Sequence, residues 1–467
     1  MPLIRSISGV RATLGDALTP FIVAEYTAAF ASYLPPGIIV VGRDGRPSGE
    51  WIEKIVCATL AASGREVLEL GIVPTPTVQL FAEHQAMAGG ISISASHNPV
   101  EWNGLKFLNN KGMFLSAEEN AQFWQCLDER QFAFVPNQHG ESMTTHQNPA
   151  AHHTESIMLL PLFSNSGNVE LIRNAHFRVV VDAVNAAGSH FIPYILKAFG
   201  CEVIPLYCDG TGIFPHTPEP IPEHLGDLSK AVVEHHADFG IAVDPDADRL
   251  VLVDERGRVV FEENTVVLAT LAVLRNKQYF GEQAYAPVVV NMSTTQAVED
   301  IAAHYGVKVI RTAVGEINVV QGMLEHGSII GGEGSGGVIL PTCHAGRDSL
   351  VGTALILLLL AQVKQERPNM TLSSIVSALP RYCMIKHKQP FHGDVQSIAT
   401  SILKRYPDAI ANTEDGLRLS FADGWIHLRT SNTEPIIRLI VEAKTQAEAE
   451  RLASTCLAVI RDNTFYH

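Results

Sequence analysis

One short pattern of residues occurs three times in this 467-residue chain and constrains its fold more than any other feature. In each copy an apolar β-branched run is followed by a polar loop, a stretch with apolar residues at helical spacing, a glycine and a second apolar run. Short strands that alternate with helices form right-handed crossovers and mostly parallel sheets. The pattern therefore predicts three similar α/β domains. The copies begin at Ile38–Val41, Arg178–Val181 and Val288–Val290, and their helices end near Gly64, Gly200 and Gly306.

The C-terminal part of the chain has a different pattern. Trp425–Arg429 and Ile436–Val441 have the apolar residues of two strands around a turn, and Thr445 and Glu448 form a T-x-x-E capping box for a helix from about Gln446. The fold class expected is thus α/β, with three similar α/β domains of mixed, mostly parallel sheets and a smaller α+β C-terminal domain. We expect the four domains at residues 1–150, 151–262, 263–372 and 373–467.

The charge balance excludes some kinds of partner. The chain has 34 Lys and Arg against 49 Asp and Glu, a formal net charge of −15. Nucleic acids and anionic membranes are bound by basic surfaces, so we expect neither as a partner. An anionic small molecule stays compatible with the sequence, because the field at a site is set by the residues around it.

Other sequence features indicate a cytoplasmic protein. The seven cysteines show no C-x-x-C spacing, which predicts reduced thiols and neither a disulfide framework nor a zinc site. The longest apolar run, Leu350–Val363, is shorter than the about 20 residues that span a bilayer and is expected to be a buried helix. The N-terminal residues lack the apolar core of a signal peptide. The polar stretch Val135–Thr154 is expected to be a solvated linker without a metal site, although it contains His139, His146, His152 and His153.

The first segment that carries chemistry is G-G-I-S-I-S-A-S-H-N-P at residues 89–99. The alternating Ile91 and Ile93 predict a strand, which places Ser96 just beyond its carboxyl end, where α/β proteins bind ligands. By itself, a serine in this place is more often a turn residue than a nucleophile. Adjacent side chains rarely face one another, so Ser96 and His97 are not expected to form a hydrolase dyad.

The second segment, D-P-D-A-D-R at residues 244–249, follows an apolar strand. Its alternate spacing can turn Asp244, Asp246 and Asp248 toward one point, and three hard oxygen donors suit Mg²⁺ or Ca²⁺. An EF-hand loop is excluded because its sixth position requires glycine and is Arg249 here. A solvated acidic turn is disfavoured, because three adjacent like charges repel unless a cation offsets them.

Two further segments suit a phosphorylated sugar. Arg429–Pro435, with Arg438 beyond it, has the hydroxyl, amide and guanidinium groups of a phosphate cradle, and it is also compatible with an ordinary polar hairpin turn. Gly331–Gly337 is neither a P-loop nor a dinucleotide motif. With one acid and one hydroxyl among its glycines, it suits sugar hydroxyls or, equally, a flexible hinge.

Taken in chain order, the four segments resemble those of the α-D-phosphohexomutase family. Its members have a phosphoserine loop ending in S-H-N-P, a D-x-D-x-D-R metal loop, a G-E-x-S-G sugar loop and an R-x-S-N-T-E-P phosphate loop, which here stand at Ser96–Pro99, Asp244–Arg249, Gly332–Gly336 and Arg429–Pro435. The resemblance covers nearly the whole chain and implies the family's heart-shaped arrangement of four domains. It extends to Gly9–Arg11, Gly42–Ser48, Pro74–Pro76, Asn103–Lys106 and Gly346–Asp348.

The resemblance implies a mutase that interconverts a hexose 6-phosphate and its 1-phosphate. Ser96 then carries a phosphoryl group, a sugar 1,6-bisphosphate is both intermediate and activator, and one Mg²⁺ per chain is held by Ser96, Asp244, Asp246 and Asp248. Lys106 transfers a proton and Arg249 supplies positive charge. The implied partner is a small phosphosugar, bound by a monomer or homodimer. The implied substrate-binding residues are Arg11, His97, Glu333, Ser335, Arg429, Ser431, Asn432, Thr433 and Arg438.

Some positions bear on the substrate. The sugar loop of many members ends in G-H, whereas here it ends in Gly336-Gly337, so His344 or no residue replaces a histidine sometimes given an acid/base role. The G-G-E-G-x-G-G form of this loop, Val314–Glu316 and the S-I-S-G-V-R start resemble phosphoglucosamine mutases, which implies conversion of glucosamine 6-phosphate to glucosamine 1-phosphate. Phosphomannomutase or phosphoglucomutase activity is the alternative, because these substrates differ only at C2. A non-catalytic phosphosugar sensor and a phosphatase using Ser96 are the alternatives outside the mutases.

Overall fold

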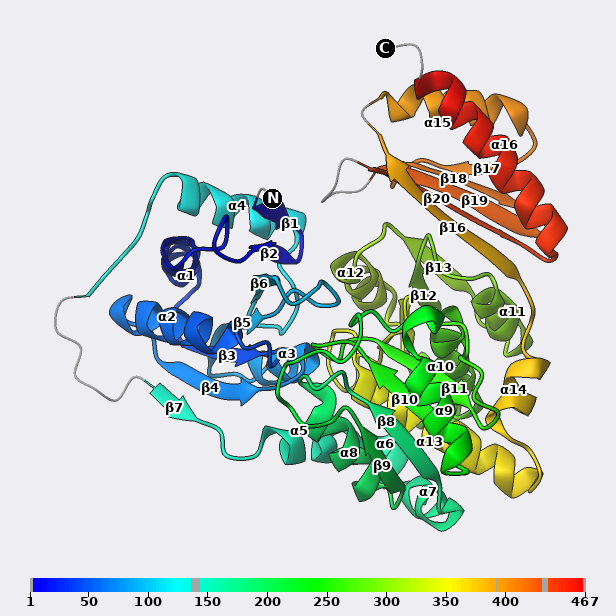
Figure 1. The fold of residues 1–467 in the computed structure, drawn as a ribbon, viewed down its shortest axis with the longest axis horizontal. Coiled ribbons are helices and arrows are strands. Elements are labelled where there is room, and N and C mark those ends of the chain that lie inside the picture. The colour runs from blue at the N-terminus through cyan, green and yellow to red at the C-terminus, as the bar shows by residue number, and fades with distance from the viewer. Residues whose placement is uncertain (1–2, 136–142, 166, 392, 431–435, 465–467) are drawn as a thin grey trace.

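A computed structural model describes residues 3–135, 143–165, 167–391, 393–430 and 436–464 of the chain. The chain folds into four successive units, each built on its own sheet. Figure 1 shows the units along an arc, with the first and the fourth at its two ends and the second and third packed together between them. The first three units are α/β and the fourth is α+β, which confirms the predicted fold class.

The first unit has a seven-stranded mixed sheet in the order β1-β2-β6-β5-β3-β4-β7. The helices α1 (Pro20–Tyr33), α2 (Gly49–Ala62) and α4 (Ala117–Asp128) share one apolar cluster with its central strands, while α3 (Thr75–Ala82) joins the core of the next units. The repeat predicted at Ile38 is β3-α2-β4. The strands are β1 (Ile4–Ser6), β2 (Gly9–Thr13), β3 (Ile38–Arg43), β4 (Val67–Ile72), β5 (Met87–Ile93), β6 (Trp102–Leu108) and β7 (Met143–Thr145).

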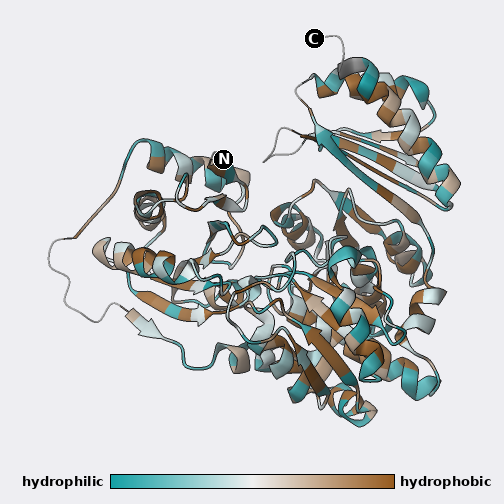
Figure 2. Ribbon diagram, viewed as in Figure 1, coloured by the Kyte–Doolittle hydropathy of each residue, from teal (hydrophilic) through white to brown (hydrophobic). Residues whose placement is uncertain are grey.

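The second and third units repeat the crossover in four-stranded sheets, β11-β10-β8-β9 and β13-β12-β14-β15. In each sheet parallel ladders are joined by one antiparallel strand at the edge, β11 or β15. Figure 2 shows hydrophobic residues concentrated on their central strands. The strands are β8 (Arg178–Asp182), β9 (Glu202–Leu206), β10 (Phe239–Val243), β11 (Leu250–Asp254), β12 (Val288–Asn291), β13 (Val309–Thr312), β14 (Gly331–Glu333) and β15 (Gly337–Ile339).

One continuous apolar core joins these two units. Its longest helix is α13 (Ser349–Glu366), which Asp348 caps by accepting a hydrogen bond from the Leu350 amide at 2.7 Å. This helix contains the apolar run that the sequence predicts to be buried, and most of it lies inside the protein. The other helices are α5 (Pro149–Met158), α6 (Pro161–Ser164), α7 (Asn168–Ala175), α8 (Gly188–Ala198), α9 (Gly226–Glu234), α10 (Glu263–Arg275), α11 (Ala297–His304) and α12 (Glu316–His326), with 3-10 turns η1 (Pro222–His224) and η2 (Lys277–Tyr285).

The fourth unit is an antiparallel sheet in the order β16-β20-β19-β18-β17 with a core of its own. The helices α15 (Val395–Arg405) and α16 (Gln446–Thr464) pack on one face of the sheet, and α14 (Leu372–Ala378) precedes it. The opposite face is directed toward the third unit (Figure 1). The strands are β16 (Cys383–Pro390), β17 (Ile410–Asn412), β18 (Leu417–Phe421), β19 (Gly424–Thr430) and β20 (Ile436–Ala443).

The polar stretch before the second unit differs from its prediction as a solvated linker. Pro149 begins α5, and His153 on that helix is completely buried, with Nδ1 2.9 Å from Thr77 Oγ1 and Nε2 2.9 Å from Asp348 Oδ2. The polar composition of the stretch concealed this, because the partners that satisfy the histidine lie far away in the sequence. The boundary expected after residue 150 falls within α5, and the boundary expected after residue 372 falls at the start of α14.

Candidate active site

Ser96 lies in a tight turn just beyond the carboxyl end of β5, as the sequence predicts. Its backbone has a left-handed φ of +50°, which is uncommon for a residue other than glycine. The side chain is buried, and its Oγ donates a hydrogen bond to Asp244 Oδ2 at 2.9 Å. The turn therefore presents the serine hydroxyl directly to the acidic loop of the second unit.

Arg46 holds this turn in place. The guanidinium is completely buried beside Asp44, with Nε 2.9 Å from Oδ2, and it donates to the carbonyl oxygens of Ser96, Asn98 and Pro99 at 2.6, 2.7 and 2.8 Å. Three convergent carbonyls on one charged donor stabilise a strained turn. Arg46 lies in Gly42–Ser48, one of the segments that resemble the family, but the sequence predicted no role for it.

The three aspartates of the acidic loop converge as their spacing predicts. Asp244, Asp246 and Asp248 are buried, and each offers an oxygen within 4.8 Å of those of the other two. The loop joins β10 to β11, and the amides of Asp248 and Arg249 both donate to Asp244 Oδ1 at 3.2 Å. Burial, and then the charges of Asp248 and Asp246, raise the pKa of Asp244 well above its usual range.

These carboxylates fit a divalent cation. Asp246 Oδ1 and Asp248 Oδ1 are buried and have no hydrogen-bond partner among the described residues. A buried carboxylate oxygen without a donor is costly, and oxygen donors of this kind are the ligands that Mg²⁺ prefers. With the Ser96 hydroxyl on Asp244, the site has the donor set that the sequence predicts for Mg²⁺.

Two cations border the aspartates. Lys106, on β6, is about 1% exposed; its Nζ contacts Asp246 Oδ2 and lies 3.6 Å from Asp248 Oδ2. Although burial opposes the charged form of Asp246, the Lys106 charge lowers the pKa of this carboxyl far below its usual range. Arg249 lies farther away, with Nε 3.9 Å from Asp244 Oδ2 and 3.8 Å from Asp248 Oδ1.

The glycine-rich segment forms a tight hairpin of β14 and β15, in which Glu333 is opposite Gly337 and Ser335 lies at the tip. Glu333 is buried, and its Oε1 accepts hydrogen bonds from Asn291 Nδ2 at 2.8 Å and from the Gly315 amide at 3.1 Å. The hairpin lies against the acidic loop, because the Leu250 amide donates to the Gly336 carbonyl at 2.9 Å. The structure thus brings the predicted sugar and metal loops together.

Arg347 joins these two loops, and the sequence gave it no role. Its guanidinium contacts Asp248 Oδ2 at 2.6 Å, Glu316 Oε2 at 2.9 Å and Glu333 Oε2 at 2.7 Å. Although burial opposes its charged form, the Asp248 and Glu333 charges raise the pKa of Arg347 well above its usual range. Its role depends on three acids that are distant in the sequence, so no local motif could reveal it.

Arg11 and His97 border the Ser96 turn. Arg11 on β2 donates from Nη1 to Asn98 Oδ1 at 3.4 Å. His97 Nδ1 is 3.5 Å from Ser96 Oγ, at the outer limit of a hydrogen bond. Burial, and then the Arg249 and Arg11 charges, lower the pKa of His97 well below its usual range. For comparison, a nucleophile and its general base usually lie about 2.6–3.2 Å apart.

The predicted phosphate loop is described only in part, because Ser431, Asn432 and Thr433 lie outside the described residues. Arg429 on β19 is directly opposite Arg438 on β20, and Arg438 is opposite Lys388 on β16. Opposed residues project from the same face of a sheet, and like charges so placed destabilise it unless an anion lies near. The row of three cations fits a phosphate, and its third member, Lys388, was missed because it depends on strand register.

A second group of metal-type ligands consists of His153, Cys343 and Asp348. Asp348 Oδ2 is 2.9 Å from His153 Nε2 and 3.1 Å from His344 Nε2, so hydrogen bonds account for this group. His344, which the sequence offered as a replacement acid or base, therefore has its Nε2 engaged by Asp348.

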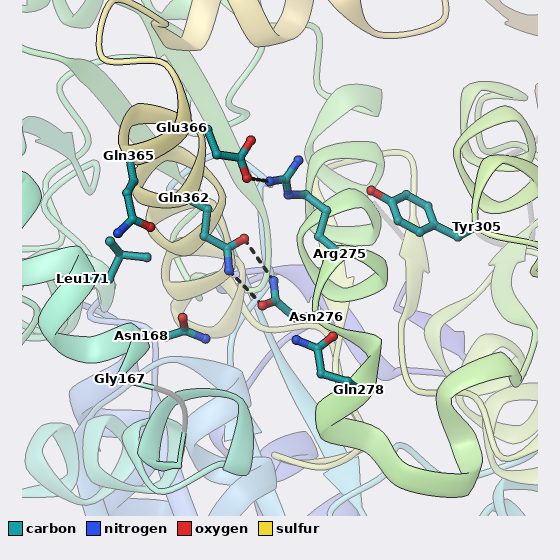
Figure 3. A pocket seen from close by; sticks show the side chains of 10 residues that line it. All are labelled: Gly167, Asn168, Leu171, Arg275, Asn276, Gln278, Tyr305, Gln362, Gln365 and Glu366. Atoms are coloured by element: carbon teal, nitrogen blue, oxygen red, sulfur yellow. Dashed lines mark hydrogen bonds and ion pairs between the residues drawn. The ribbon is translucent and has the colours of Figure 1, made fainter.

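A cavity of about 560 Å³ lies elsewhere, between α7, α10 and α13. Figure 3 shows that polar side chains of its lining bind one another: Arg275 pairs with Glu366, and the amides of Asn276 and Gln362 form hydrogen bonds. Its lining contains none of the predicted site residues. The cavity is therefore separate from the candidate active site.

Comparison with protein families gives a match in each unit. The descriptions "Phosphoglucomutase/phosphomannomutase, alpha/beta/alpha domain I", "domain II" and "domain III" match residues 4–134, 162–257 and 263–382. The description "Phosphoglucomutase/phosphomannomutase, C-terminal domain" matches residues 394–458. The four matches follow one another in chain order, as the four sheets do.

Relatives match over nearly their whole length. The chain is 36% identical over 452 residues to "Phosphoglucomutase/phosphomannomutase" of Thermococcus kodakarensis, covering 94% of each chain. It is 32% identical over 461 residues to "Probable phosphoglucosamine mutase" of Pyrococcus abyssi, covering 97% of each. A solved phosphoglucomutase/phosphomannomutase family protein from Burkholderia thailandensis has the same fold, with a TM-score of 0.83, 24% identity and 99% and 98% of the two chains covered.

Proposed function

The chain belongs to the phosphoglucomutase/phosphomannomutase family of α-D-phosphohexomutases, and from this premise we propose that it interconverts a hexose 6-phosphate and its 1-phosphate through phosphorylated Ser96. The observation that carries the proposal is the contact between Ser96 and the acidic loop, with the hydroxyl 2.9 Å from Asp244 and two carboxylate oxygens beside it without donors. A serine so placed can pass a phosphoryl group back and forth beside a cation.

We assign the metal to Asp244, Asp246, Asp248 and the group on Ser96. When bound there, Mg²⁺ neutralises charge on the phosphoryl group, the main requirement of this kind of transfer. A divalent cation also offsets the repulsion of three buried carboxylates. Arg249 then adds fixed positive charge at the edge of the site.

The reaction is proposed to run in two halves. In the first, the bond between phosphorus and Ser96 Oγ breaks, a bond from phosphorus to a sugar hydroxyl oxygen forms, and the hydroxyl proton passes to Lys106, which acts as the neutral amine. In the second, the bisphosphate has turned over, the other phosphoryl group returns to Ser96, and the proton is returned. The family relationship supports this sequence of steps, and so do the contacts of Lys106 with Asp246 and Asp248, two of the proposed metal ligands.

The remaining predicted residues bind the sugar and its idle phosphate. We assign the sugar hydroxyls to Glu333 and Ser335, and the idle phosphate to Arg429 and Arg438, together with the predicted Ser431, Asn432 and Thr433. Arg11 and His97 are assigned to the phosphate at the reacting end. Closure of the fourth unit over the ligand is proposed to exclude water, which would otherwise hydrolyse the phosphoserine.

We propose glucosamine 6-phosphate and glucosamine 1-phosphate as the preferred pair, because several relatives at 31–33% identity carry the name "Probable phosphoglucosamine mutase". A second candidate is phosphoglucomutase or phosphomannomutase activity, favoured by the name of the relative at 36% identity. Discrimination at C2 requires a few contacts to an amino group or a hydroxyl, and these contacts set the preference.

The test compares kcat/KM for the 1-phosphates of glucosamine, glucose and mannose, with Mg²⁺ and the matching 1,6-bisphosphate present. We expect the three values of kcat/KM to differ from one another by large factors, with the highest value for glucosamine 1-phosphate. Ser96→Ala is the matched control and is expected to bind the sugar phosphates without isomerising them. Binding without turnover by the unaltered protein would instead indicate a phosphosugar sensor, and release of inorganic phosphate would indicate a phosphatase.

A further inference from the structure

Arg347 distributes its three nitrogens among three acids from different elements. Asp248 belongs to the acidic loop, Glu316 begins α12 and Glu333 ends β14. The planar fork of arginine can serve three carboxylates at once, whereas the single ammonium of lysine cannot reproduce this geometry. The arrangement is buried, with 12% of the Arg347 side chain and 1% of the Asp248 side chain exposed. Removal of such a cation leaves several buried acids uncompensated.

Gly337 provides the room for this side chain. A Cβ on Gly337 would lie 2.3 Å from Arg347 Cδ and 3.0 Å from Cγ, far inside van der Waals contact. The backbone of Gly337 is not left-handed, in contrast to Gly336 with a φ of +87°. The Arg347 side chain, and not the backbone conformation, therefore requires glycine at 337.

The base of Arg347 is fixed as well. Arg347 forms a bridge with Ile339 beside β15, and the next amide, that of Asp348, donates to the Val338 carbonyl at 2.8 Å. Asp348 also caps α13 and is held by two histidines. Arg347 thus has a rigid origin on one side and three fixed acceptors on the other.

We propose that Arg347 is the positioning residue that holds Asp248 of the metal loop and Glu333 of the sugar loop in one arrangement, and that Gly337 is glycine to admit it. Arg347 engages Asp248 Oδ2, whereas Asp248 Oδ1 is buried without a hydrogen-bond partner among the described residues and is open to a cation. By engaging Glu333 Oε2, while Asn291 and Gly315 engage Oε1, it sets the direction of the remaining lone pairs. The inference rests on the proposed mutase function and concerns how metal and sugar binding are coupled.

Three variants test the inference. Arg347→Gln removes the charge, Arg347→Lys keeps the charge without the fork, and Gly337→Ala displaces the fork without altering any charge. Gly226→Ala is the matched control, because its Cβ meets nothing within 4 Å and its backbone is not left-handed. For each variant we would measure kcat and KM for the sugar phosphate, and the Kd of Mg²⁺ alone by titration calorimetry of the phosphate-free protein.

The inference expects Arg347→Gln and Gly337→Ala each to raise the Mg²⁺ Kd and the sugar-phosphate KM, with a loss of about 10- to 100-fold in kcat/KM. Arg347→Lys is expected to recover part of this loss. The double variant Arg347→Gln/Gly337→Ala is expected to be no worse than Arg347→Gln alone, since both changes remove the same contact.

Three results would overturn the inference. The first is a Gly337→Ala protein with wild-type Kd and KM, and the second is a loss in the double variant equal to the sum of the single losses. A lower melting temperature with unchanged Kd and KM would indicate a structural role only, which also contradicts it. If the unaltered protein and Gly226→Ala do not isomerise any sugar phosphate, the proposed function fails; the Mg²⁺ titrations still test the positioning role.

Discussion

Two boundaries in this molecule are built differently. Where the first three units meet, charged side chains interlock: Ser96 and Lys106 contact the acidic loop, and Arg347 ties that loop to the sugar hairpin. Where the third and fourth units meet, one lysine makes the ion pairs described, since Lys386 on β16 contacts Glu262 at 2.9 Å and Glu263 at 2.8 Å. The other bonds described there pair a side chain with a backbone or neutral group. Ser293 Oγ is 2.8 Å from His427 Nδ1, and the Val314 amide donates to Asp415 Oδ2 at 2.9 Å.

The difference suggests that phosphoryl transfer and binding of the idle phosphate are assigned to different parts of the site. Groups that we propose to exchange a phosphoryl group are held in a rigid, buried arrangement, as transfer by positioning and electrostatics requires. The cations that we propose to hold the idle phosphate lie on a separate sheet with its own core, and the residues that join it to the third unit differ from those of the first boundary. The following predictions test that division, from the largest expected effect to the smallest.

The largest effect is expected at the interlocked boundary. Asp246→Asn removes one metal ligand and the partner of Lys106, so kcat is expected to fall at least about 1,000-fold, a loss of several kcal/mol of charge stabilisation. The circular dichroism spectrum should be unchanged, since asparagine has nearly the same shape. Full turnover of this variant would refute the metal assignment. Chelation of Mg²⁺ with EDTA should produce the same loss in the unaltered protein and be reversed by added Mg²⁺.

An intermediate effect is expected at the other boundary. Arg429→Gln removes one cation of the row on the fourth unit, and the KM of the sugar phosphate should rise about 10- to 100-fold, because a charged hydrogen bond contributes about 1.5–3 kcal/mol. The Mg²⁺ Kd should not change, since the proposed metal site lies at the interlocked boundary. A changed Mg²⁺ Kd would show that the two boundaries are not independent.

A smaller change in KM is expected at Lys388, the third cation of the same row. Lys388→Gln is expected to raise KM only about threefold, because this lysine is exposed and its contribution is screened by water and salt. The effect should shrink further at higher ionic strength. Lys404→Gln, in the last turn of α15, is the control and should have no effect.

How far these features follow from the sequence depends on the distance between partners. The three crossovers, the buried helix and the convergence of the three aspartates follow from local periodicity and spacing, so the sequence predicts them. The meeting of Ser96 with the aspartates was expected only from the resemblance to the phosphohexomutases. Arg347, Lys388 and the buried His153 depend on partners in other units or on strand register, and no short pattern contains that information. The absent histidine at Gly337 is likewise explained only by the Arg347 side chain that occupies its space.

The last prediction concerns stability rather than activity, and it depends on the pH at the boundary between the third and fourth units. Glu442 accepts hydrogen bonds from the Gln296 amide and Trp425 Nε1, both at 2.7 Å, and burial raises its pKa from 4.5 to about 7. A raised pKa means that the folded protein holds the proton more tightly. The stability contributed by protonated Glu442 is therefore fully present below about pH 4.5 and is lost as the pH rises through about 7.

Melting curves test this contribution. Between pH 5 and pH 8, the unaltered protein should lose stability at this site, on the order of 2 kcal/mol, relative to Glu442→Gln. Glutamine can accept both hydrogen bonds without ionising, so the difference between the two proteins should grow with pH. A constant difference across this range would contradict the assignment.

The central claim, that Ser96 carries the phosphoryl group, has one direct test. The protein is incubated with Mg²⁺ and a hexose 1,6-bisphosphate, separated from ligand, and analysed by intact mass and peptide mapping before and after addition of the corresponding hexose 6-phosphate. The account predicts one phosphate on the peptide that contains Ser96, and its transfer to the sugar as bisphosphate on the second addition. Isomerisation by a protein that never carries phosphate on Ser96 would contradict the account.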